Sequence, residues 1–470
     1  MQYLSTRGRA PVLGFEDAML AGLARDGGLY LPESWPQISA DEIAGFVGMP
    51  YAQVAIRVMR DFVGADIGEA EFAGIVEEAY GTFDVAEVAP LVQIAPQSWI
   101  CELFHGPTLA FKDIAMQLLA RLMDRALTRR GKRATVVGAT SGDTGGAAVE
   151  AFAGTEAIDI FILHPNGRVS DVQRRQMTGA AESNVHNIAV EGTFDDCQAL
   201  VKALFNDHAL RDSLALAGVN SINWARIMAQ TVYYFTSAAA LGAPAREVGF
   251  AVPTGNFGDI FAGYAASRMG LPISRLVIAT NENDILARTL ASGRYQPKSV
   301  VATTSPSMDI QVSSNFERLL FEVSGRSGER VRSMMRELGE SGAIELNPTE
   351  IQSIRAAFAA HRIDQDEAAE TIRQLCQEQD YIADPHTAVG VAAAAREELD
   401  PGSAMVALGT AHPAKFPDAV KRACGKTPIT PDCLEKRLQA EERYDVLGND
   451  FAVIAEYLTE RSRALAEPQL

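Results

Sequence analysis

The feature that most constrains this chain is a regular alternation of short apolar runs with longer helical patterns, which begins near residue 131. Glycine-rich turns follow several of the runs, as expected where a turn connects a buried strand to the helix that follows it. Strands joined through helices lie parallel in one sheet, so this pattern predicts an α/β fold. The runs that we expect to be buried strands are 134–137, 160–163, 249–252, 276–278 and 405–408.

The length of the chain indicates more than one lobe. Its 470 residues are more than usually pack around one hydrophobic core, so we expect at least two lobes. Residues 1–90 show helical patterns outside the alternation and are predicted to form a separate, mostly helical N-terminal unit. Residues 91–470 then make up the α/β part, interrupted by a mostly helical insertion around 285–380.

A lysine at the start of a predicted helix is the first candidate for chemistry. Residues 113–130 carry apolar side chains at helical spacing, and Lys112 precedes them within the segment FHGPTLAFKD at 104–113. Apolar surroundings and a helix N-terminus both favour the neutral amine, which is the form that bonds to an aldehyde. The alternative is an ordinary solvated lysine at a helix entrance.

Two glycine turns, each between a predicted strand and a predicted helix, are candidate anion sites, because backbone N–H groups converge there. The first, at 138–146, contains Ser141, Gly142, Asp143 and Thr144. The second, at 252–259, contains Gly255, Asn256, Phe257, Gly258 and Asp259. Two such turns call for two anions, which a cofactor phosphate and an anionic substrate would supply. The alternative for each is a structural turn without a ligand.

The first turn also resembles a loose dinucleotide-binding pattern, so a nicotinamide enzyme is a competing hypothesis. That class needs an acidic residue for the ribose near the end of the next strand, and Leu163-His164-Pro165 provides none. The seven histidines and five cysteines form no metal-ligand spacing, and no GK[ST] or GxSxG motif occurs. Catalysis by a metal ion or by a serine triad is therefore not expected.

Further polar residues follow the last predicted strand, where ligands of such sheets bind. Thr410 offers a neutral hydroxyl to a cofactor, and His412 or Lys415 offers a charged contact. A buried histidine with a structural role is the alternative for His412, and His386 is open to the same two interpretations.

The net charge of −18 disfavours nucleic-acid or anionic membrane surfaces as partners, because both would repel the protein. The first residues lack the apolar run of a signal peptide, and no later stretch approaches 18 apolar residues. We therefore expect a cytoplasmic protein with a small-molecule substrate.

Taken together, these motifs resemble the threonine synthase family of fold-type II enzymes that depend on pyridoxal 5'-phosphate. The segment 104–113 looks like the family's Schiff-base signature, and segments 5–8 (STRG) and 22–32 (GLARDGGLYLP) are similar to its N-terminal part. The resemblance implies that Lys112 bonds to the cofactor, that residues 255–259 hold its phosphate, and that residues 141–145 receive the substrate carboxylate. It also implies that Thr410 lies near the pyridine nitrogen and that residues 91–470 contain two parallel-sheet α/β lobes.

The activity implied by the resemblance is the conversion of O-phospho-L-homoserine and water into L-threonine and phosphate. Arg226, in the segment NSINWAR at 220–226, is the candidate for the substrate phosphate, with a surface salt bridge as the alternative. Two other functions stay open: a phospho-lyase that releases 2-oxobutyrate, and a non-catalytic protein that binds a metabolite. Microbial relatives suggest a monomer, although the sequence does not exclude a dimer.

Overall fold

The structure, a computed structural model, describes residues 1–140 and 142–465. The N-terminal residues form a helical unit with a small antiparallel pair of strands. Thr6 Oγ1 donates to Glu317 Oε1 at 2.5 Å, and Arg7 Nη2 lies 3.0 Å from Glu317 Oε2, so the unit is bonded to the rest of the chain. Its elements are β1 Tyr3–Ser5, α1 Phe15–Ala21, β2 Tyr30–Pro32, α2 Ala40–Gly45, α3 Tyr51–Val63 and α4 Glu69–Tyr80.

The α/β part contains two main sheets. The smaller sheet is parallel throughout, and its described strands run in the order β15-β7-β6-β5-β8. Its edge strand β15 comes from the far C-terminal part of the chain. The strands are β5 Ala134–Ala139, β6 Ile158–Pro165, β7 Val185–Glu191, β8 Leu216–Ala217 and β15 Asp445–Gly448. The helices around it are α6 Asp143–Phe152, α7 Asp171–Thr178, α8 Phe194–Asn206, α9 His208–Ser213, α19 Asp432–Gln439 and α20 Phe451–Arg461.

The larger sheet has its described strands in the order β13-β10-β9-β14-β4-β3, and all neighbours are parallel except β3 and β4. The strands are β3 Leu91–Ala95, β4 Ser98–Glu102, β9 Val248–Pro253, β10 Ile273–Thr280, β13 Phe358–Arg362 and β14 Ala404–Gly409. The helices that contact its strands include α11 Gly258–Arg268, α12 Ile285–Ser292 and α17 Pro385–Ala394. Outside these, α10 Trp224–Ala240 packs on α11, α16 Gln365–Glu378 packs on α17, and α18 Pro417–Cys424 packs on α16.

The segment 285–380 is mostly helical but does not stand apart from the α/β scaffold. Its strand β13 pairs with β10 at the edge of the larger sheet. The sequence FAAHR of β13 has no run of branched apolar residues, because an edge strand is only partly buried. The remaining elements are β11 Arg294–Tyr295, η1 Pro306–Met308, α13 Phe316–Val323, α14 Gly328–Ser341, β12 Ile344–Glu345 and α15 Pro348–Ala357.

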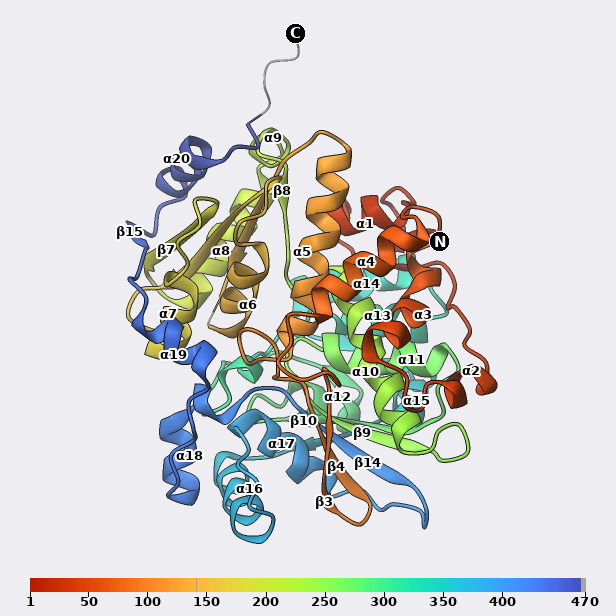
Figure 1. Cartoon of the computed structure of the whole chain (residues 1–470). Helices are drawn as coiled ribbons and strands as arrows, with labels where there is room; N and C mark the ends of the chain where they lie inside the picture. The colour runs from red at the N-terminus through yellow and green to blue at the C-terminus, as the bar shows by residue number, and fades with distance from the viewer. Residues whose placement is uncertain (141, 466–470) are drawn as a thin grey trace.

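Helix α5, Lys112–Arg129, lies at the centre of the molecule. Figure 1 shows it between the smaller sheet and the helices of the N-terminal unit, and it packs against α4, α6 and α10. The five predicted strand runs fall within β5, β6, β9, β10 and β14, and the predicted helix at 113–130 coincides with α5. The predicted α/β fold with two parallel-sheet lobes is therefore confirmed. None of the described helices combines the length and apolar character needed to cross a membrane.

Candidate active site

Lys112 is the first residue of α5. Hydrogen bonds within the preceding loop fix its position. The Asp113 carboxylate accepts hydrogen bonds from Thr108 N at 2.8 Å and from Thr108 Oγ1 at 2.6 Å. A Cβ on Gly106 would lie 2.5 Å from Asp113 Cβ, so only glycine fits this turn. The loop is also bonded to the segment after β14, since Phe111 N donates to the carbonyl oxygen of Thr410 at 2.9 Å. Lys112 and Thr410 are therefore brought together by backbone hydrogen bonds.

The amine of Lys112 is buried beside a carboxylate. Its Nζ lies 3.7 Å from Asp143 Oδ2 and 4.5 Å from the centre of the Phe111 ring. Burial lowers the pKa of Lys112; Asp143 opposes this shift, and the charges of Lys415 and Arg226 add to it. The site thus favours the neutral amine more than water does.

Asp143, the first residue of α6, is bonded to several side chains of both lobes. Lys415 Nζ lies 3.1 Å from Oδ1, Gln173 Nε2 donates to Oδ1 at 2.9 Å, and Ser307 Oγ donates to Oδ2 at 3.2 Å. Burial alone would raise the pKa of Asp143, but Lys415 and Lys112 outweigh burial and hold it well below its usual range. The Asp143 carboxylate is negatively charged and pairs with two cations, so it cannot itself bind an anion. The 138–146 turn would instead contact an anion through its backbone N–H groups.

The backbone of the 138–146 turn is organised by Thr140. Its Oγ1 accepts from Gly142 N at 2.9 Å and from Gly145 N at 3.0 Å. Gly142 has a φ of 151°, and Gln173 occupies the place where a Cβ would point. Thr144 is half-buried on the first turn of α6. The predicted site residue Ser141 lies outside the described residues.

The 252–259 turn leads into α11, and Phe257 at its N-cap has a φ of 65°. Asn256 is exposed and Phe257 is buried. A Cβ on Gly255 would lie 2.8 Å from the carbonyl oxygen of Ser307, so residue 255 is crowded by the segment 306–310. Among the described residues no side chain caps α11, which leaves its N-terminal N–H groups for an anion. Gly258 begins the helix.

The Asp259 side chain points away from such an anion and into the core. Tyr234 Oη donates to its Oδ1 at 3.0 Å, and Tyr233 Oη donates to the same oxygen. Burial raises the pKa of Asp259 to about 6, although the two tyrosines oppose the shift. Within the 252–259 turn, the groups suited to an anion are therefore on the backbone.

Thr410 and Arg226 are buried polar residues with unused hydrogen-bonding capacity. Thr410 N donates to Thr387 Oγ1 at 3.2 Å, but Thr410 Oγ1 has no partner among the described residues. Arg226, on α10, is 3% exposed, and its Nη1 donates to the carbonyl oxygen of Val219 at 3.3 Å. Its Nε has no partner, and no carboxylate pairs with it in the described part of the chain. The alternative of a surface salt bridge for Arg226 is therefore wrong.

Several site residues were not predicted from the sequence. Ser307 and Gln173 belong to no motif, and only their contacts with Asp143 reveal them. His386, left open by its sequence context, is buried, with Nδ1 2.7 Å from Asp384 Oδ1 and Nε2 accepting from Ser307 N at 3.3 Å. Burial lowers the pKa of His412 to about 4, so this residue is neutral and provides no charged contact near neutral pH.

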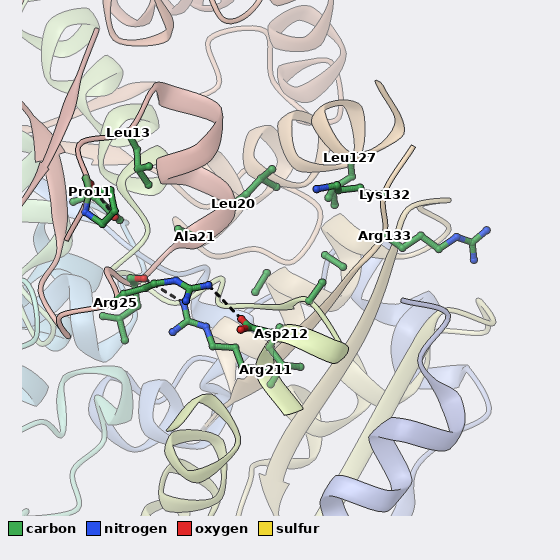
Figure 2. A pocket seen from close by; sticks show the side chains of 16 residues that line it. Pro11, Leu13, Leu20, Ala21, Arg25, Leu127, Lys132, Arg133, Arg211 and Asp212 are labelled. Atoms are coloured by element: carbon green, nitrogen blue, oxygen red, sulfur yellow. Dashed lines mark hydrogen bonds and ion pairs between the residues drawn. The ribbon is translucent and has the colours of Figure 1, made fainter. Parts of the chain in front are cut away.

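A cavity of about 380 Å³ lies elsewhere, between the N-terminal unit, the end of α5 and β8. Figure 2 shows Arg25 and Asp212, an exposed pair 3.4 Å apart, among the side chains that line it, while Arg133 extends away from the others. The cavity is lined by none of the residues around Lys112. Among the described residues, no cluster of His, Cys, Asp and Glu side chains is arranged to hold a metal ion.

The residues around Lys112 fit pyridoxal phosphate. The cofactor's aldehyde requires an amine, its phosphate an anion cradle, and its pyridine nitrogen a polar neighbour. Lys112 is a buried amine with a lowered pKa, α11 has an uncapped N-terminus, and Thr410 Oγ1 is a buried hydroxyl without a partner. Each of these groups suits one part of the cofactor.

Comparison with known proteins agrees with this fit. Three family models match the chain: "Threonine synthase N terminus" at residues 2–80, "Pyridoxal-phosphate dependent enzyme" at 86–410 and "Threonine synthase, C-terminal" at 387–458. The curated threonine synthase of Pseudomonas aeruginosa is 51% identical over 98% of both chains.

Solved structures give the same result. The crystal structure of PLP-bound threonine synthase from Brucella melitensis has a TM-score of 0.96 and 58% identity, covering 98% of this chain and 100% of that one. The structure of yeast threonine synthase has a TM-score of 0.93 and 39% identity over 98% of each chain. With matches of this extent and a site that fits the cofactor, the chain belongs to the threonine synthase family of pyridoxal-phosphate-dependent enzymes.

Proposed function

We propose that this protein is a threonine synthase, which converts O-phospho-L-homoserine and water into L-threonine and phosphate. The observation that carries the proposal is the position of Lys112: its buried amine lies beside the Thr410 segment, near Arg226, and 3.7 Å from Asp143. The relatives named threonine synthase cover nearly the whole chain, which supports the same activity.

Three parts of the chain would hold the cofactor. Lys112 would bond to its aldehyde, the backbone of residues 255–259 would bind its phosphate, and Thr410 Oγ1 would contact the pyridine nitrogen. A neutral hydroxyl there leaves that nitrogen largely unprotonated. When bound, pyridoxal phosphate withdraws electrons from the substrate carbons near its bond to the substrate amine, which makes their protons acidic.

The substrate carries two anionic groups, and the site offers a place for each. Residues 141–144, at the N-terminus of α6, would bind the carboxylate through backbone N–H groups other than that of Gly142, which donates to Thr140 Oγ1. Arg226 would bind the substrate phosphate, because its buried guanidinium has no carboxylate partner among the described residues and its Nε donor is unused. Burial lowers its pKa to about 10, so Arg226 is still charged near neutral pH.

Lys112 would move the protons of the reaction. Released by the substrate amine, its neutral Nζ would take up the α and β protons one after the other, since an amine holds only one extra proton, and phosphate would leave the γ carbon. Water would then add at the β carbon and give its second proton to the phosphate, while the two protons taken from carbon would be returned to the γ and α carbons. Asp143 would keep the lysine in reach between these steps, since it attracts Nζ whenever the lysine is protonated.

One incubation tests the proposed function. Purified protein with pyridoxal phosphate and O-phospho-L-homoserine should release phosphate and L-threonine in equal amounts. Phosphate together with 2-oxobutyrate would instead identify a phospho-lyase, in which the unsaturated intermediate escapes before water adds. No phosphate release at all would favour a non-catalytic protein that binds a metabolite.

The domain division stays a proposal: a unit at 1–90 and a catalytic part at 91–470, with an insertion around 285–380. The start of β3 at Leu91 supports the first boundary. The monomeric state and the cytoplasmic location likewise stay predictions, which size-exclusion chromatography with light scattering and cell fractionation would check.

A further inference from the structure

A second buried lysine, Lys415, faces the same carboxylate as Lys112. Its side chain is 0% exposed, and its Nζ lies 3.1 Å from Asp143 Oδ1 while Lys112 approaches Oδ2. Lys415 Nζ also donates to the carbonyl oxygen of Thr108 at 2.7 Å, within the loop that holds Lys112. Lys415 ends η2, Pro413–Lys415, just beyond β14. Two ammonium groups therefore share one carboxylate.

One of these two charges is temporary if Lys112 has the proposed role. Lys112 must lose a proton to bond to an aldehyde, and its pairing with Asp143 then disappears. A buried carboxylate left without a cation is strongly unfavourable, so a site with only one lysine would resist that proton loss. Lys415 does not bond to the cofactor in the proposed function, and its Nζ contacts both the carbonyl oxygen of Thr108 and the carboxylate of Asp143.

We propose that Lys415 is a positioning residue, the permanent counter-ion of Asp143, which allows Lys112 to give up its proton and bond to the cofactor. This inference rests on the proposed role of Lys112 as the covalent lysine. The positive charge of Lys415 also lowers the pKa of Lys112, which acts in the same direction. The other titratable or charged groups around these three residues are Arg226, Asp113, Asp259 and, beside Asp143, His386. They stay the same in every variant considered below.

The test follows the bonding of Lys112 to pyridoxal phosphate, not turnover. Full-length protein stripped of cofactor is mixed with pyridoxal phosphate across a pH series, and the rate at which the bound cofactor's absorbance appears is recorded. Lys415→Gln keeps an N–H donor for Thr108 but removes the charge. We expect the pH of half-maximal rate to rise by about one unit, a roughly tenfold slower reaction below that pH.

Asp143→Asn should shift the same midpoint in the opposite direction, because Lys112 then keeps its cationic neighbour and loses its anionic one. In the double variant Asp143→Asn with Lys415→Gln, both charges are gone and the midpoint should return toward that of the unsubstituted protein. The matched control is Lys421→Gln on the exposed surface of α18, which should leave the midpoint unchanged.

An unchanged or lowered midpoint in Lys415→Gln would overturn the inference, since a role limited to hydrogen bonding would be preserved by glutamine. If circular dichroism shows that Lys415→Gln does not fold, the double variant decides: its midpoint must lie above that of Asp143→Asn. Failure of the unsubstituted protein to bond to pyridoxal phosphate would instead contradict the proposed function, so the two failures are distinguishable.

Discussion

The two glycine turns at 138–146 and 252–259 are built alike but differ in what their aspartates contact. Each turn joins a parallel strand to a helix whose N-cap residue makes no side-chain capping bond, and each has an aspartate in the first helical turn. Asp143 faces the ammonium groups of Lys112 and Lys415, whereas Asp259 faces the phenol groups of Tyr233 and Tyr234. Both carboxylates are buried.

This difference gives the two aspartates opposite pKa shifts. Two lysines hold the pKa of Asp143 well below its usual range, while burial raises that of Asp259 to about 6 because its partners carry no charge. A strand–turn–helix motif thus provides the backbone donors, whereas the residues packed around the motif determine the charge of its aspartate. The 138–146 turn therefore places a charged carboxylate beside two lysines, whereas the proposed phosphate role of the 252–259 turn depends on its backbone N–H groups alone.

The largest effect is expected from Lys112, which lies near both aspartates. Lys112→Ala should abolish the absorbance of the covalently bound cofactor and lower kcat on the order of 10³-fold or more, because it removes both the bond and the proton carrier. Spectra and phosphate release measure the two effects. Lys202→Ala, on the exposed face of α8, is the control. An undiminished cofactor band in Lys112→Ala would mean that another amine serves.

A carboxylate at position 255 tests the phosphate role of the 252–259 turn. Gly255→Asp should weaken pyridoxal phosphate binding more than Gly255→Asn, by about tenfold or more, since only the former repels a phosphate. Both side chains crowd the carbonyl oxygen of Ser307 in the same way, so the difference between the variants reports charge alone. Equal dissociation constants, measured by titration with pyridoxal phosphate, would place the phosphate elsewhere.

If the 252–259 turn binds the cofactor phosphate, the substrate phosphate needs a separate cation, and Arg226 is the candidate. Arg226→Ala should raise KM for O-phospho-L-homoserine by about 10- to 100-fold, as expected for the loss of a charged hydrogen bond of about 1.5–3 kcal/mol. Steady-state kinetics measure this change, and the dissociation constant for pyridoxal phosphate serves as the control. A normal KM would show that Arg226 has a structural role.

The smallest effect is a difference in pH dependence between the two aspartates. The folded chain raises the pKa of Asp259 from 3.8 to about 6, so it binds this proton more tightly than the unfolded chain does. That stabilisation is present at low pH and is lost as pH rises through 6. The variant Asp259→Asn lacks this loss. The difference in free energy of unfolding between this variant and the unsubstituted protein should therefore shift in favour of the variant by about 1 kcal/mol between pH 5 and pH 7.

Asp143→Asn gives the contrast for this measurement. The pKa of Asp143 is lowered, so its carboxylate is ionised throughout that pH range in both the folded and the unfolded chain. Measured in a Lys112→Ala background, which removes the coupled titration of Lys112, the stability difference caused by Asp143→Asn should therefore stay constant from pH 5 to pH 7. Urea denaturation of the cofactor-free protein at both pH values measures both variants. If the stability difference changed with pH in the same way in both variants, the two turns would not differ in their electrostatics as described.

The sequence alone determined the strands, the two turns and the candidate lysine. Buried parallel strands are continuous apolar runs, and a strand followed by a glycine turn and a helix is a local pattern. The motif at 104–113 likewise identified Lys112, because each of its features is set by neighbouring residues. The edge strand β13 was not predicted, since partial burial leaves no apolar run.

Only the tertiary structure decided which side chains meet. Ser307, Gln173 and Lys415 reach Asp143 from three segments far apart in the sequence, and no spacing rule connects them. Arg226 required the same information: the sequence allowed a surface salt bridge, but packing buries the residue and leaves its Nε without a partner among the described residues. Burial and charge pairing depend on contacts across the fold, whereas strands and turns depend on adjacent residues.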